Sequence, residues 1–160
     1  LSLKFKIYNM ITIEEFKKKH SNKARFVGLD LGSKRIGVSI CDERQSIATP
    51  FKTINKTNTN ELIEMLKTVI KENNIKGIII GNPINMDGSL GRSAQSVNDV
   101  ASNISKSIDL PVILWDERLS TVGAFKLSGQ LDINVSKRVK TIDQNAAAFI
   151  LQGAIDYLNN

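Results

Sequence analysis

The chain has 160 residues, of which 41% are apolar and 24% are charged, a balance typical of one globular domain with its own core. No run of about 20 apolar residues and no signal-peptide pattern is present, so we expect a cytoplasmic protein that does not bind membranes. Lys and Arg number 22 against 16 Asp and Glu, which gives a net charge of +6 and a pI near 9.5. A basic surface favours nucleic acid as a partner, although a Lys-rich composition alone would also produce this charge.

The sequence holds one cysteine and one histidine. Cys41 has no second cysteine for a disulfide or a zinc site, and it follows an apolar run, which predicts a small buried strand residue. His20 lies in the polar segment "FKKKHSNK", so a Ser-His-Asp or Cys-His catalytic device is excluded. If the protein is an enzyme, its acid–base chemistry must then come from carboxylates, lysines or a metal.

Residues 1–23 are predicted to be an N-terminal extension and residues 24–160 a single domain. Apolar runs bounded by turn residues predict strands over 24–32, 35–42, 46–54, 75–81 and 110–115. The first two strands flank a tight turn at Gly32-Ser33-Lys34, and Pro50 marks the third as an edge or bulged strand.

Apolar stripes at helical spacing predict helices over 58–74, 90–108, 119–129 and 141–158. Asn58 and Glu61 form a helix-start pattern, and Thr141 with Gln144 has the same spacing; residues 131–140 read as a basic loop. Three antiparallel strands followed by strand–helix crossovers predict an α/β mixed sheet with helices on both faces.

Three acidic residues lie next to predicted central elements, where sites of α/β sheets gather. Asp30 lies within the first strand, Glu117 follows the last strand in "WDERLST", and Asp143 lies in the predicted first turn of the last helix. Converging carboxylates would repel one another unless a divalent cation lay between them, and Mg²⁺ prefers oxygen ligands. Two such ions could activate a water and stabilise the leaving oxygen of a phosphodiester. The sequence therefore predicts a carboxylate metal site.

Each acid also has a plainer interpretation. A helix macrodipole would favour an ionised Asp143 at a helix start, where acids are common in any case. Glu117 could be a surface acid paired with Arg118 or Arg35. Asp30 is the least easily explained in this way, because lone buried acids are rare. Asp116 should point away from the site, since neighbouring residues of an extended segment face opposite ways.

Basic residues lie in or beside the same predicted loops and could hold nucleic-acid phosphates by charge. A solvated rim is the alternative for any single one of them. Aromatic residues make up only 6% of the chain, so a base-stacking platform is not expected and recognition would rest on backbone and shape. The predicted nucleic-acid-binding residues are Lys34, Arg35, Arg92, Arg118, Lys137 and Arg138, with Lys140 nearby.

Four motifs resemble those of the YqgF-type family: "GLDLGSKRIGVSI", "GNPINMDGSLGRSAQSV", "DERLST" and "IDQNAAAFILQ". Members of that family are described as Holliday junction resolvases and as nucleases that mature the pre-16S ribosomal RNA. The resemblance implies a ribonuclease-H-like fold with a site dependent on Mg²⁺ or Mn²⁺. It makes Asp30, Glu117 and Asp143 both the catalytic residues and the metal ligands.

Further matches place Lys34, Arg35 and Gly37 in the family's turn, Asn82, Pro83, Asp87 and Gly88 in its loop, and Arg118 and Thr121 in its strand-end motif. Asn82 departs from the family, which usually has Leu there. The N-terminal extension lies outside the family pattern.

The leading functional prediction is a metal-dependent endonuclease that cuts structured nucleic acid, most simply at the 5′ end of pre-16S rRNA during ribosome biogenesis. The alternatives are a Holliday junction resolvase in DNA recombination and repair, or a non-catalytic nucleic-acid-binding module. A kinase-type phosphotransferase is disfavoured because the chain is short for two lobes and lacks a Walker-type loop. A monomer or homodimer is expected, since symmetric junction cutting would need two sites.

Overall fold

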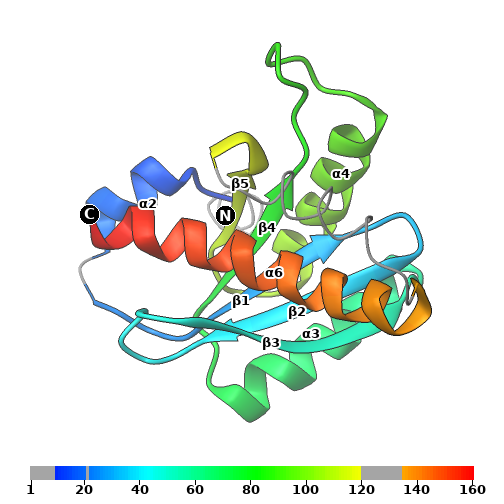
Figure 1. The fold of residues 1–160 in the computed structure, drawn as a ribbon. Coiled ribbons are helices and arrows are strands. Elements are labelled where there is room, and N and C mark those ends of the chain that lie inside the picture. The colour runs from blue at the N-terminus through cyan, green and yellow to red at the C-terminus, as the bar shows by residue number, and fades with distance from the viewer. Residues whose placement is uncertain (1–9, 21, 120–134) are drawn as a thin grey trace.

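The computed structural model describes residues 10–20, 22–119 and 135–160, with side chains from Asn145 onward in the last range. Its sheet has five strands in the order β3-β2-β1-β4-β5 (Figure 1). The strands are β1 Phe26–Leu31, β2 Arg35–Cys41, β3 Ala48–Asn55, β4 Gly77–Asn82 and β5 Val112–Asp116. The helices are α2 Ile13–Lys19, α3 Thr59–Asn73, α4 Arg92–Ser107, the 3-10 turn η1 Glu117–Leu119 and α6 Val135–Asn159.

The sheet is mixed, as predicted. The strands β1, β2 and β3 pair antiparallel, whereas β1, β4 and β5 pair parallel. Strand β3 forms one edge, and the β2–β3 register shifts between Val38 and Ser39, opposite Pro50. Proline cannot donate to a strand ladder, which explains why it is tolerated at this irregular edge. Because the parallel strands end at the same edge, their terminal residues are brought together there.

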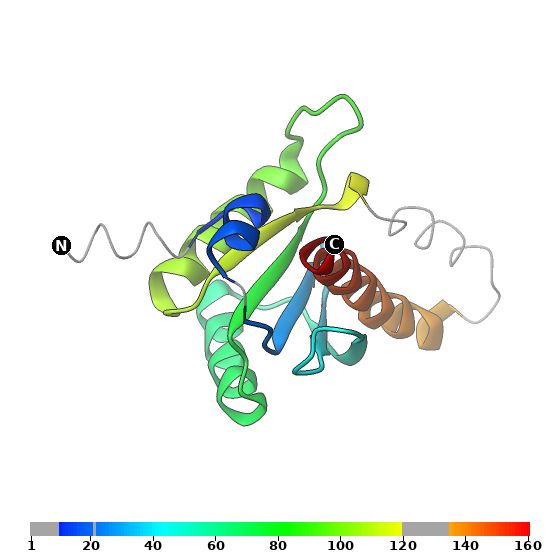
Figure 2. The same cartoon turned by 90° about the vertical axis from the view of Figure 1, so that its left-hand side faces the viewer.

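Helices cover both faces of the sheet (Figure 2). On one face α3 and α4 bury a cluster built around Leu29, Leu66 and Ile80. On the other face α6 buries a second cluster that includes Phe26 and Ile150. Alternation along each strand divides its residues between these two clusters. Helix α3 begins as predicted, since the side chain of Asn58 accepts a hydrogen bond from the backbone N–H of Glu61 at 2.9 Å.

Part of the N-terminal segment packs on the domain. Helix α2 buries Ile13 and Phe16 in the cluster under α6, and Met10 forms a parallel bridge with Val112 on the β5 edge. Its start is capped by the hydroxyl of Thr12, which accepts from the backbone N–H of Glu15. The sequence pattern did not anticipate this burial, because a helix of two turns offers few apolar positions from which to read a face.

The last helix starts earlier than predicted. Helix α6 begins at Val135, so residues 135–140 are helical rather than a basic loop, and Thr141 and Gln144 do not mark its first turn. The predicted start was wrong because the spacing of Thr141 and Gln144, which is typical of a helix start, also occurs inside helices. Helix α4 begins at Arg92, which leaves Leu90 in the preceding loop and half exposed. Most of the predicted helix 119–129 lies outside the described residues.

Candidate carboxylate site

Asp30 is a buried acid on the α6 face of the sheet. It is 6% exposed, and it lies opposite Gly37 of β2 in the antiparallel register. Val27 and Leu29 belong to the cluster under α3 and α4, so alternation turns Asp30 to the other face. The parallel β1–β4 register pairs Leu29 with Ile80, and its next step brings Asp30 level with Gly81. Asp30 therefore lies between two residues without side chains.

Glu117 reaches the same place from β5. It begins η1 directly after Asp116, and its carboxyl carbon lies 3.4 Å from the point where a Cβ on Gly81 would be. A Cβ at Gly81 would also lie 2.5 Å from Cδ1 of Ile150 on α6. A side chain at Gly81 would therefore displace the end of Ile150, whereas its Cβ would meet Glu117 at ordinary contact distance. Two predicted site residues, Asp30 and Glu117, therefore lie on the same face of the sheet.

Asp143 is placed only by the backbone of α6. Since α6 begins at Val135, position 143 lies about two turns into the helix. The macrodipole effect fades beyond the first turn, so the helix-start argument for its ionisation is wrong. Position 143 precedes Ala147 by one turn and Ile150 by two, and both of these are buried against the sheet. Helical periodicity therefore keeps position 143 on the face that packs on the sheet.

The residues present suit a hard divalent cation. Asp30 and Glu117 offer carboxylate oxygens, the donors that Mg²⁺ and Mn²⁺ prefer. Within the described side chains, no group of three His, Cys, Asp or Glu residues forms a complete metal cage. The third predicted ligand, Asp143, lies where side chains are not described.

Asp116 faces away from Glu117, as the alternation of side chains along a strand predicts. Its carboxylate forms an ion pair with Arg118. The guanidinium of Arg118 donates from Nη2 to Oδ2 of Asp116 at 2.7 Å and from Nε to Oδ1 at 3.0 Å. These bonds lower the pKa of the Asp116 carboxyl and raise that of Arg118. The Nη1 of Arg118 also donates to the carbonyl of Asn85 at 3.4 Å. Arg118 therefore joins the end of β5 to the loop after β4.

That loop, residues 83–91, is held by its own polar groups. Asp87 accepts from the hydroxyl and the backbone N–H of Ser89, and these bonds lower the pKa of its carboxyl. Gly88 has a φ of 87°, a left-handed conformation that glycine adopts without strain. Met86 near the tip is 87% exposed, and the loop projects beyond the sheet edge (Figure 1).

The described members of the predicted nucleic-acid-binding set come from three places in the fold. Lys34 and Arg35 lie at the β1–β2 turn, and Arg118 is occupied by Asp116. Arg92 begins α4 and borders a cavity on the opposite face of the sheet. Lys137 and Arg138 lie in the first turns of α6, where side chains are not described. Their phosphate-binding roles stay predictions.

Asn82, the departure from the family motif, points away from the carboxylates. It shares the alternation of Ile78 and Ile80, which face α3 and α4. Asn82 is 7% exposed, and its Oδ1 has no hydrogen-bond partner among the described residues. The sequence reasoning missed Gly81 as part of the site. A signal was present, because a glycine that ends the apolar run "IIIG" next to a strand-end motif marks a close approach.

The five-stranded mixed sheet with helices on both faces is a ribonuclease-H-like fold. A family description, "RuvX: Holliday junction resolvase", matches residues 24–157. The chain belongs to this family of nucleases and resolvases.

Curated relatives agree with this assignment. A protein of Pelagibacter ubique named "Putative pre-16S rRNA nuclease" is 88% identical over 151 residues, which cover 94% of this chain and 100% of the relative. A protein of the same name from Rhodobacter capsulatus is 46% identical over 132 residues, 82% of each chain.

A solved structure supports the fold alone. The Thermus thermophilus RuvC in complex with a Holliday junction superposes with a TM-score of 0.55 at 10% identity, over 84% of this chain and 94% of that one. No helix that the structure describes is long and apolar enough to cross a membrane.

Proposed function

We propose that this protein is a divalent-metal-dependent endonuclease whose substrate is the precursor of the small-subunit ribosomal RNA. The single observation that carries the proposal is that buried Asp30 and half-buried Glu117 lie on the same face of the sheet, where the parallel strands end. Carboxylate oxygens are the ligands that a hard divalent cation prefers. The names of the curated relatives favour the RNA substrate.

The chain's own residues would bind and orient the reacting groups. Asp30 is fixed by β1, which is hydrogen-bonded to strands on both sides, and Glu117 is fixed where β5 turns into η1. Both would hold the cation, with Asp143 as the third predicted ligand. When bound, such a cation supplies a Lewis acid and lowers the pKa of a water ligand. Lys34 and Arg35, at the adjacent turn, would position the phosphate backbone.

The test compares cleavage by wild type, Asp30→Asn and Glu117→Gln on a transcript that spans the 5′ end of 16S rRNA, with Mg²⁺, Mn²⁺ or EDTA. We expect each substitution to lower the cleavage rate by about 100-fold or more, the scale seen when a group that stabilises the transition state is lost. RNA binding should stay within about threefold, because the basic residues remain. Asp109→Asn is the matched control, since Asp109 is exposed and precedes β5 at the opposite sheet edge. Unchanged cleavage by Asp30→Asn would reject the role given to Asp30.

A Holliday junction resolvase is the second candidate, favoured by the family description. A four-way DNA junction assayed beside the RNA separates the two substrates. Faster cutting of the junction, in symmetrical pairs, would move the assignment to DNA. Failure to cut either substrate across the metal series would favour a non-catalytic binding module.

A further inference from the structure

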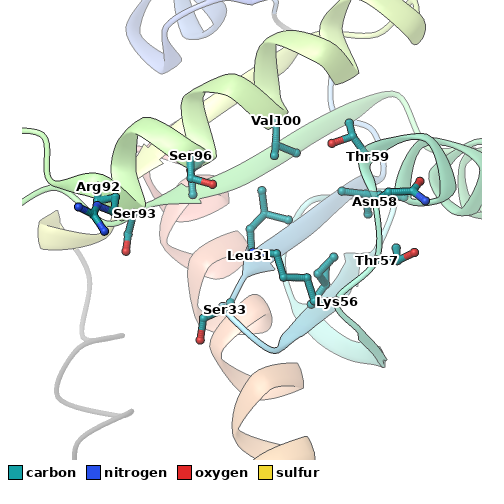
Figure 3. A pocket seen from close by; sticks show the side chains of 14 residues that line it. Leu31, Ser33, Lys56, Thr57, Asn58, Thr59, Arg92, Ser93, Ser96 and Val100 are labelled. Carbon is teal, nitrogen blue, oxygen red and sulfur yellow. The ribbon is translucent and has the colours of Figure 1, made fainter.

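A second candidate site lies on the face of the sheet opposite Asp30 and Glu117. It is a cavity of about 480 Å³ between the β1–β2 turn and the first turns of α3 and α4 (Figure 3). This volume falls within the range of about 300–1,000 Å³ that is usual for small-molecule sites. Leu31 lines it, whereas the preceding residue, Asp30, faces α6. The two sites are therefore separated by the thickness of the sheet.

One wall of the cavity is aliphatic. Ile36 of β2, Leu62 of α3 and Val97 of α4 contribute to it, and all three belong to the buried cluster of that face. Val100 extends the wall along α4 (Figure 3). An inorganic anion would leave this wall without a partner. A ligand with a flat or apolar part would cover it.

The rim of the cavity is polar and positively charged. Lys56 and Arg92 line it together with the hydroxyls of Ser33, Ser93 and Ser96, and none of the described lining residues is acidic. Figure 3 labels Arg92 and Ser93 together at one end, where α4 begins. Within the described chain, Lys56 and Arg92 form no ion pair, unlike Arg118. Their charges therefore complement an anionic ligand.

The start of α4 adds donors to the same end. Its N-cap is Gly91, which makes no side-chain capping bond, and its first turn holds no acidic residue. By contrast, α3 is capped by Asn58. The free backbone N–H groups of a helix start favour an anion, and here they reinforce two cationic side chains that stand at a cavity.

We propose that this cavity binds a nucleoside monophosphate. Its base and sugar would lie on the wall formed by Ile36, Leu62 and Val97, and its phosphate would lie at Arg92. The nucleotide is either free in solution or the terminal nucleotide of a nucleic-acid strand. The inference does not rest on the proposed nuclease activity, because it uses the other face of the sheet and needs no metal.

The test is calorimetric titration of the full chain in EDTA, which keeps divalent cations out of the carboxylate site. The probes are the four ribonucleoside 5′-monophosphates, adenosine and inorganic phosphate. We expect at least one nucleotide to bind about tenfold or more tightly than adenosine or phosphate, since only the nucleotide uses wall and rim together. Absence of saturable binding by every nucleotide at millimolar concentration would overturn the proposal.

Two substitutions locate the binding. Arg92→Gln removes the charge at the phosphate end, and Ser96→Glu adds an acid to the rim, so both should weaken binding by about tenfold or more. Lys106→Gln is the matched control, because it makes the same charge change at the exposed last turn of α4. Thermal unfolding checks that each variant folds. Equal binding by wild type and both variants would place the nucleotide elsewhere and refute the site.

A further pair of probes identifies the source of the nucleotide. A trinucleotide with a 5′ phosphate is compared with the same trinucleotide bearing a 5′ hydroxyl. Preference for the phosphorylated trinucleotide over the mononucleotide supports capture of a strand end. Equal or tighter binding of the mononucleotide supports a free ligand. Because no cleavage is measured, failure here leaves the nuclease proposal intact, and failure of cleavage leaves this result intact.

Discussion

The two faces of the sheet differ in charge and in packing. On the α6 face lie the carboxylates of Asp30 and Glu117, and Ile150 of α6 packs closely over Gly81. On the α3–α4 face, Lys56 and Arg92 border a cavity that has no acidic residue among its described lining. Residues that are neighbours in the sequence face these two different environments. Asp30 faces α6, whereas Leu31 lines the cavity on the other face. Alternation along a strand thus lets one short segment serve two chemically opposite surfaces.

The largest expected effect concerns the α3–α4 face. Leu66 of α3 is fully buried in the cluster that supports the cavity. Leu66→Ala should lower the free energy of unfolding by about 2–5 kcal/mol, because it removes buried methyl groups and leaves a void. Urea denaturation measures this, with exposed Lys67→Ala as the control. A loss below about 1 kcal/mol would mean that the cluster collapses around the gap and that the cavity wall is not rigid.

A smaller effect is expected on the α6 face, where glycine sets the distance between helix and sheet. A Cβ on Gly28 would lie 2.4 Å from Oγ of Ser39 and 2.7 Å from Cβ of Leu151. Gly28→Ala should therefore destabilise the protein by about 1–3 kcal/mol through overpacking. It should also lower cleavage, since α6 carries position 143.

The matched control for that substitution is Gly91→Ala. Gly91 has a φ of −73°, and its Cβ would meet Asn85 only at ordinary contact distance, 3.4 Å. Thermal unfolding compares the stability of both variants with that of wild type. Equal stability of Gly28→Ala and wild type would show that α6 can move away from the sheet, contrary to the tight packing inferred here.

The smallest expected effect concerns the ion pair at the end of β5. Hydrogen bonds from Arg118 lower the pKa of Asp116 in the folded protein. The ionised Asp116 carboxylate therefore contributes its full stabilisation above the pKa of about 3.9 that it has in the unfolded chain. This stabilisation is lost as the pH falls through the lower pKa of Asp116 in the folded protein. Asp116→Asn should be slightly less stable than wild type at pH 7, by less than Gly28→Ala.

The difference between Asp116→Asn and wild type should shrink as the pH falls below about 4. Urea denaturation at a series of pH values measures it. A difference that stays constant with pH would assign the effect to packing of the loop 83–91 rather than to charge.

Periodicity and turn chemistry determined much of this protein. Alternation and short apolar runs predicted every strand of the sheet, and the Asn58 cap predicted the start of α3. Cys41 was predicted to be a buried strand residue and is 2% exposed, with burial raising the pKa of its thiol. The acids Asp30 and Glu117 were singled out because a charge within or beside an apolar run needs an explanation. These inferences succeed because each depends on residues close together in the chain.

Tertiary structure alone decided how distant segments meet. The close approach of Ile150 of α6 to Gly81, and the position of Glu117 beside it, depend on how α6 packs on the sheet and on the register of β4 with β5. The cavity lies between the β1–β2 turn and the first turns of α3 and α4, and no local sequence pattern predicts that these segments meet. The start of α6 at Val135 also escaped the sequence, since a capping spacing recurs inside helices. Local preferences fix which segments are helix or strand, whereas packing between segments fixes which side chains share a space.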